Sequence, residues 1–241
     1  YNGANDAGSK YVYLPLSTSV ANTNYFQKSG YSIKVDNTSQ PLQPDIFLRT
    51  YLYATDVSEN ISDAGDGFNL IGNPFTAYLH ANTAADATNN LLSANGEVLE
   101  EQTIWLWDNA KVGGAGWITV NLSDASYRIS PVQGFFVRAK VGGGTTQPFS
   151  FTKSMRTHTK EGNFYKSSQN RFEIDLSVAI ENLKTNTAIR YVENTSTSFD
   201  NGYDSSMFGG YGSALEIYTG LVDGSSGKKL AIQSLPNTDY E

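Results

Sequence analysis

The sequence predicts an all-β protein built from antiparallel β-sandwiches, and three observations predict this class. Apolar and polar residues alternate with a period of two in most apolar segments, which is the pattern of half-buried strands. The chain has 15 Tyr, 12 Phe and 22 Gly among 241 residues, a balance that favours short strands joined by tight turns. Helix formers gather only at 84–101, where irregular apolar spacing allows at most one short helical turn.

Charge and composition exclude several functional classes. Lys and Arg number 17 against 24 Asp and Glu, so the net charge of −7 argues against nucleic acid as a partner. The chain has no Cys, which excludes disulfides, thiolate metal sites and cysteine nucleophiles. No apolar run approaches the roughly 20 residues of a membrane-spanning helix. The first residues resemble neither a signal peptide nor a natural start, so we expect an excised piece of a longer protein.

The first 62 residues predict a hairpin. Residues 11–16 are a candidate strand that Pro15 restricts to an edge or a strand end. Residues 30–35 alternate, with Tyr31, Ile33 and Val35 on one face, and residues 46–53 are rich in β-branched and aromatic side chains. These two segments are predicted to pair.

The stretch 67–74, Gly-Phe-Asn-Leu-Ile-Gly-Asn-Pro, is predicted to be a buried strand that leaves through a fixed turn, because the residue before a proline is driven toward extended geometry. Two more hairpins are predicted after it. One joins 103–107 to 117–120 through a glycine-rich loop, and its first strand is apolar on both faces and therefore central. The other joins 129–140 to 148–152.

A repeat is visible at a fixed offset. Gly30 and Gly134 lie 104 residues apart (134 − 30), and the same offset matches Tyr31 with Phe135, Ile33 with Val137, Lys34 with Arg138 and Phe47 with Phe151. A self-match of this kind predicts one hairpin unit used twice. Residues 1–62 would be the end of one copy and 63–163 the second copy, so that hairpins 30–53 and 134–153 are expected to superpose.

The last third, 164–241, is predicted to be a second and incomplete sandwich, with the boundary near residues 161–163. Residues 172–180 alternate apolar residues with carboxylates and Ser, and 188–193 are expected to pair with them. About four strands are few for a sandwich. We therefore expect residues 229–235 to leave one side unpaired, as a template for a strand donated by another polypeptide.

Six motifs together resemble a known family. They read Gly-Phe-Asn-Leu-Ile-Gly-Asn-Pro (67–74), Ile-Trp-Leu-Trp-Asp (104–108), Ile-Ser-Pro-Val-Gln-Gly-Phe-Phe-Val (129–137), Met-Arg-Thr-His (155–158), Phe-Asn-containing Phe-Asp-Asn-Gly-Tyr-Asp (199–204) and Leu-Ala-Ile-Gln-Ser-Leu-Pro (230–236). In this order they resemble the region that precedes the C-terminal sorting signal in proteins of the type IX secretion system. The resemblance implies a β-sandwich, export by the outer-membrane machinery of a Gram-negative bacterium through a downstream sorting domain, and a secreted or cell-surface location. It supplies no active site.

Catalytic patterns are not found. The two histidines, His80 and His158, have no metal-ligand spacing, and no Gly-x-Ser-x-Gly elbow is present. Gly142–Gly144 lacks the Lys-Ser/Thr of a phosphate loop. Glu100-Glu101 or Asp63 with Asp66 could suggest glycoside hydrolysis, but neighbouring strand residues point to opposite faces. We expect no enzyme activity.

Two binding sites remain as alternatives to structural roles. Trp105, Trp107 and Trp117 could form an aromatic platform for a glycan, although sandwich cores also use tryptophan and the core is favoured. Asp200, Asn201 and Asp204 place three oxygen-bearing side chains in one loop, which suits calcium, although such residues also cap turns and capping is favoured. No other cofactor is expected.

Two functions of different class follow. The first is a non-catalytic secreted or cell-surface module that serves as a stalk, adhesion or anchoring region, with a glycan or surface structure as its partner. The second is a carbohydrate-binding module, and a glycoside hydrolase fragment is a weaker third.

Overall fold

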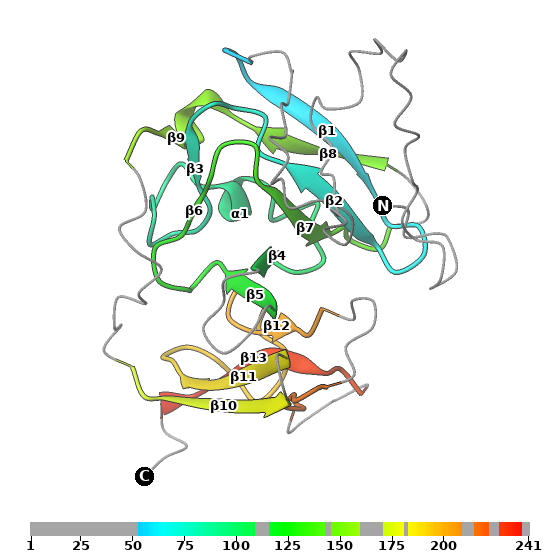
Figure 1. Cartoon of the computed structure of the whole chain (residues 1–241), viewed down its shortest axis with the longest axis vertical. Helices are drawn as coiled ribbons and strands as arrows, with labels where there is room; N and C mark the ends of the chain where they lie inside the picture. The colour runs from blue at the N-terminus through cyan, green and yellow to red at the C-terminus, as the bar shows by residue number, and fades with distance from the viewer. Residues whose placement is uncertain are drawn as a thin grey trace, which may run out of the picture.

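A computed structural model describes residues 53–108, 116–142, 146–159, 171–180, 183–208, 215–221 and 227–237 (Figure 1). Within these ranges the helical elements are α1 (Leu91–Ala94) and the 3₁₀ turn η1 (Lys153–Met155). The prediction of an all-β chain without a helix longer than about three turns is therefore confirmed. No helix in the described part of the chain is long and apolar enough to span a membrane.

The strands form four sheets in the described ranges. One sheet has the order β2-β7-β4-β5, a second pairs β1 with β8, a third has the order β6-β3-β9, and the last has the order β10-β11-β13-β12. Their bounds are β1 Val57–Ser62, β2 Phe68–Gly72, β3 Tyr78–His80, β4 Thr103–Asp108, β5 Gly116–Asn121, β6 Arg128–Ile129, β7 Gly134–Arg138, β8 Thr146–Phe151, β9 Arg156–Thr157, β10 Glu173–Ile180, β11 Leu183–Tyr191, β12 Ser205–Ser206 and β13 Leu230–Leu235. Residues 53–159 form a sandwich, and the sheet of β10 to β13 lies beyond β4 and β5 (Figure 1).

One antiparallel ribbon runs through two of these sheets. β1 pairs with β8 and β2 pairs with β7, so the chain segments on both sides of the ribbon turn from one sheet into the other at a corner near residues 63–67. Gly67 has φ +75° there, and a Cβ atom would lie 3.2 Å from the carbonyl oxygen of Ala139. The amide of Asn69 donates to the carbonyl oxygens of Ser62 and Gly67, which fixes the corner.

The predicted hairpin of 129–140 with 148–152 is wrong. β7 has Phe135, Phe136 and Val137 buried and lies between β2 and β4, so both of its edges are occupied and β8 pairs with β1 instead. Its proposed partner in the repeat, 30–52, lies outside the described residues. The expectation that 30–53 and 134–153 superpose as hairpins fails at the second segment.

The predictions for 67–74 and for 103–120 are confirmed. β2 ends before Asn73, which is buried and whose side-chain amide donates to the carbonyl oxygens of Ala77, Ile129 and Ser130. β4 pairs with β5 along its whole length and lies between β7 and β5, as a strand apolar on both faces should. The core beneath these strands is a single apolar cluster that includes Ile104, Leu106 and Phe149.

The hairpin predicted for the last third is also confirmed, because β10 pairs antiparallel with β11. The open side predicted for 229–235 is wrong. β13 pairs in parallel with β11 on one side and antiparallel with β12 on the other, and Leu230 exchanges two backbone hydrogen bonds with Thr219. The strand that our truncation argument left half-paired thus has neighbours on both sides, and the described residues of this region form one four-stranded sheet. The domain bounds themselves stay a prediction.

Candidate functional site

The densest set of polar and aromatic contacts lies where the four-stranded sheet meets the sandwich. We call this contact region the junction. The sandwich contributes residues around β4, β5 and β7, and the second sheet contributes Arg171, Arg190 and the segment 203–208 that contains β12. β5 is the strand of the sandwich that contacts both β11 and β12.

The centre of the junction is aromatic. The ring of Phe208, from the second sheet, lies 4.1 Å from that of Trp117, 4.7 Å from Phe136 and 4.8 Å from Phe68, measured between centroids. Trp105 lies beside them and donates its indole N–H to the carbonyl oxygen of Ser206 at 3.0 Å. Large apolar rings therefore bury themselves between the two parts.

Glu101 is a buried carboxylate at the edge of this cluster. It accepts hydrogen bonds from the backbone N–H of Ser206 at 2.8 Å and from the Ser206 hydroxyl at 2.6 Å. Its other contacts are ion pairs with Arg138 at 3.3 Å and Lys228 at 3.9 Å. A buried carboxylate is tolerated because these donors replace its water shell. Glu101 thus ties β7 of the sandwich to β12 of the second sheet.

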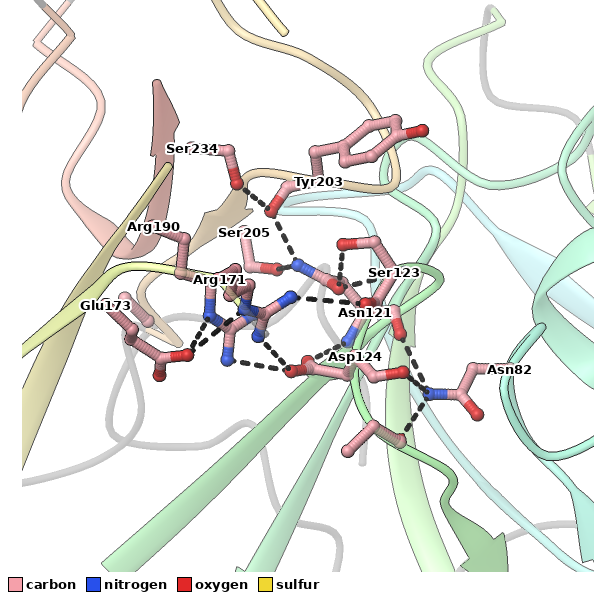
Figure 2. A network of polar contacts seen from close by, with 12 residues as sticks. Asn82, Asn121, Ser123, Asp124, Arg171, Glu173, Arg190, Tyr203, Ser205 and Ser234 are labelled. Carbon is pink, nitrogen blue, oxygen red and sulfur yellow. Dashed lines mark hydrogen bonds and ion pairs between the residues drawn. The ribbon is translucent and has the colours of Figure 1, made fainter. Parts of the chain in front are cut away.

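A second polar network crosses the junction beside β5 (Figure 2). Asp124 accepts from the guanidinium of Arg190 at 2.7 Å, and Glu173 pairs with Arg171 at 3.2 Å. Burial and the nearby Arg190 lower the pKa of Arg171, while Glu173 and Asp124 oppose that shift. The amide of Asn121 donates to the carbonyl oxygen of Tyr203 at 2.6 Å, so the network joins the sandwich to both β11 and the segment before β12.

The loop of Asp124 is held from the sandwich side. The side-chain amide of Asn82 donates to the carbonyl oxygens of Asp124 at 3.0 Å and of Ala125 at 2.8 Å (Figure 2). The second carboxylate oxygen of Asp124 accepts the backbone N–H of Asn121. The carboxylate is therefore positioned before the arginines reach it.

The three residues predicted as an alternative calcium site serve the turn that leads into β12. Asp200 accepts from the backbone N–H and hydroxyl of Ser196, and Asn201 accepts the backbone N–H of Gln102. Asp204 accepts the backbone N–H groups of Asp200 and Ser234. Burial, with contributions from the charges of Asp200 and Glu101, raises the pKa of Asp204 to about 6, although the two backbone N–H groups oppose that shift. These are the contacts of turn capping, and in the described residues no three His, Cys, Asp or Glu side chains gather as a metal site.

The three tryptophans do not form one platform. Trp105 has no exposed surface, so it cannot stack on a ligand. Trp117 lies partly buried against Phe208, whereas Trp107 is 48% exposed and meets Trp117 edge to face at 5.2 Å. Of the predicted platform, Trp107 is the residue that presents a large exposed ring.

The two histidines are separated. His80 lies in β3, where partial burial lowers the pKa of its imidazole despite the opposing charge of Asp86, and His158 is exposed after β9. The two carboxylate pairs weighed for glycoside hydrolysis are also accounted for in part, since Glu101 is buried in the junction and Asp63 accepts the backbone N–H of Gly142.

The chain matches the model of a family described as Domain of unknown function (DUF8693) over residues 11–238. It belongs to this family. No curated protein and no solved structure matches the chain. The range matched by the DUF8693 model includes both the sandwich and the four-stranded sheet, so the junction lies inside a single family domain.

Sequence reasoning missed the residues that carry the junction of this DUF8693 domain. Glu101 drew attention only as half of a carboxylate pair, and Asp124 and Arg190 drew none. One signal was present for Glu101, because a charged residue directly before a strand that is apolar on both faces must be paired when that strand is central. Its partner at residue 206 could not be read from the sequence.

Proposed function

We propose that this chain is a non-catalytic β-sandwich module of a secreted or cell-surface protein carried by type IX secretion, where it serves as a stalk, adhesion or anchoring region. Such a module must hold the parts of its parent protein at a fixed spacing and orientation. The observation that carries the proposal is the junction, in which buried charges and interlocked rings join the two parts.

The junction favours a rigid spacer for a physical reason. Hydrogen bonds and ion pairs that cross between two buried surfaces are satisfied in one relative orientation, because a shifted orientation would leave Glu101 or Arg190 buried without partners. The ring of Phe208 sets the same orientation by shape. The net charge of −7 and the lack of Cys are consistent with a soluble surface module that does not depend on disulfides.

Rigidity can be measured directly, because the chain has no Cys and introduced cysteines are therefore the only labelling sites. We would replace the exposed Val141 in the sandwich and the exposed Ile180 in the second sheet by Cys and attach spin labels. A spacer gives one narrow distance distribution by pulsed electron paramagnetic resonance, and Glu101→Ala broadens it. A broad distribution in the chain without the Glu101 change would refute the spacer function.

Location needs a separate test. In the bacterium that encodes the chain, an antibody against it is expected to label intact cells or the culture fluid. Inactivating the type IX outer-membrane machinery should retain the protein inside the cell envelope. Unchanged labelling after inactivation would contradict export by that route while leaving the spacer function to the distance measurement.

The exposed ring of Trp107 favours one second candidate, a carbohydrate-binding module. An exposed indole can stack on the apolar face of a sugar, and its contact with Trp117 fixes its orientation. Trp107→Ala should then abolish binding on a glycan array. Tyr218→Ala is the matched control, since that ring is also 48% exposed but lies outside β4 and β5. Equal loss in both variants, or no binding by the unchanged chain, would remove this candidate.

A further inference from the structure

The outer face of β10 is apolar and exposed. Phe172, Ile174, Leu176 and Ile180 are 55%, 36%, 41% and 56% exposed, and they occupy alternate positions, so their side chains share one face of the sheet. Together they leave roughly 300–400 Å² of apolar surface in contact with water, a patch of the size that marks interaction sites on soluble proteins. The polar face of the same strand, with Glu173, turns toward the junction.

β10 is also the end strand of its sheet, since the order is β10-β11-β13-β12. Its hydrogen-bond phase follows from one contact: the N–H of Tyr191 donates to the carbonyl oxygen of Phe172, which lies opposite it. In an antiparallel pair, bonded and non-bonded positions alternate, so Ile174, Leu176 and Val178 direct their backbone groups to β11. Ser177 and Ala179 direct theirs away from the sheet. No strand in the described ranges pairs with them on that side.

We propose that this edge and the apolar face beside it bind an extended segment of a partner polypeptide, which adds a strand next to β10. Backbone groups that point outward at Ser177 and Ala179 require an extended occupant, because only a strand presents N–H and C=O groups at the matching spacing. The row of Ile174, Leu176 and Ile180 requires apolar side chains at alternate positions of that segment. This inference does not depend on the route of export.

Charge defines the remaining positions of the partner. The strand reads Glu-Ile-Asp-Leu-Ser-Val-Ala-Ile, so its polar face carries two carboxylates and no basic group. Cross-strand pairs of opposite charge are favourable and pairs of like charge are not, so the partner has Lys or Arg opposite Asp175. A second copy of this chain is disfavoured as the occupant, because each copy carries a net charge of −7 and an acidic β10 of its own.

The probe is a synthetic eight-residue peptide that alternates Val with Lys. We expect it to bind the chain, to protect the amides of Ser177 and Ala179 from hydrogen exchange, and to leave those of Leu176 and Val178 unchanged because they already bond to β11. A peptide with Glu in place of Lys and one with the same composition but all Val together should each bind at least tenfold more weakly. Methylation of the peptide backbone nitrogens on one edge should abolish binding, and methylation on the other edge should not.

Matched variants locate the site on the protein. Leu176→Ser should weaken binding of the Val-Lys peptide at least tenfold, and Val141→Ser, at a side chain that is 73% exposed in the sandwich, should leave it unchanged. Circular dichroism on both variants checks that they fold, and the peptide series on the unchanged chain tests the proposal if Leu176→Ser does not fold. The proposal is overturned if the three peptides bind equally, if both methylated peptides bind, or if light scattering shows a dimer that Leu176→Ser dissociates.

Discussion

In the sandwich, Phe135, Phe149 and Phe151 are fully buried inside one apolar cluster, whereas in the four-stranded sheet Phe172, Leu176 and Ile180 lie exposed on the outer face. The buried side of that second sheet is instead rich in polar residues, among them Thr187, Arg190, Asp204, Ser205 and Ser234. A sheet of this kind gains little stability from its own apolar burial. Its order depends on the junction with the sandwich.

This difference teaches how stability is divided in the chain. The sandwich has a closed core and should retain its fold when the junction is weakened. The second sheet buries few large apolar residues, chiefly Phe208, Leu230 and Ile232, and should lose order first. Three measurements test this division, beginning with the one of largest expected effect.

Glu101→Ala should be the most damaging. It removes the acceptor of both donors of Ser206 and the partner of Arg138, and breaking a buried pair in this way costs about 3 kcal/mol or more. We expect the loss to be local, so that amides of β10, β11 and β13 exchange faster while those of β4 and β7 stay protected. Glu101→Gln, which keeps the shape and one acceptor, is the control and should cost less. Faster exchange throughout the sandwich would mean that the two parts unfold as one unit.

A smaller effect should come from pH through Asp204. Because its pKa is raised to about 6 in the folded chain, the folded state binds this proton more readily than the unfolded state, and stability rises as pH falls through 6. Between pH 7.5 and 5 the gain should be about 1 kcal/mol from this group. Urea unfolding at several pH values measures it. The difference between the chain and Asp204→Asn isolates the Asp204 contribution from that of other carboxylates, and an identical pH slope in both would contradict the assignment.

The smallest effect should be at Lys229. Its ammonium pairs with Glu216 at 2.6 Å, but both side chains are largely exposed, and exposed ion pairs add little to stability. Lys229→Ala should leave the urea midpoint unchanged within error. A loss comparable to that of Glu101→Ala would show that surface pairs, rather than the junction, hold the second sheet.

The strands were predictable from sequence where the pattern is local. The alternation of 172–180 and the doubly apolar 103–107 placed β10 and β4 correctly, because the side-chain period reflects burial directly. The all-β class and the short helical turn at 91–94 followed for the same reason.

Pairing between distant segments was not predictable. Residues 134–138 and 146–151 are close in sequence and separated by glycines, so they resembled a hairpin. The sequence gives no sign that 57–62 competes successfully for β8. The pairing of β13 with β12 was missed because β12 has two residues and no apolar pattern.

The candidate site was predicted only in part for a related physical reason. Trp105 and Trp117 were correctly weighed as core residues, since large rings are usually buried. The junction partners Glu101 and Ser206 are 105 residues apart, and Asp124 and Arg190 are also distant in sequence. Such contacts exist only after the second sheet has docked.

The ribbon of β1 with β8 has a mechanical consequence. Val57 lies opposite Phe151, so the two chain segments enter and leave the ribbon side by side. Tension applied through those segments would pull the strands apart at one end and break their hydrogen bonds one after another. The parallel pair of β11 and β13 would instead be sheared along its length if pulled through the start of β11 and the end of β13, which loads its bonds together. In a stalk under tension, the β1–β8 end of the sandwich is therefore where the molecule yields first and lengthens.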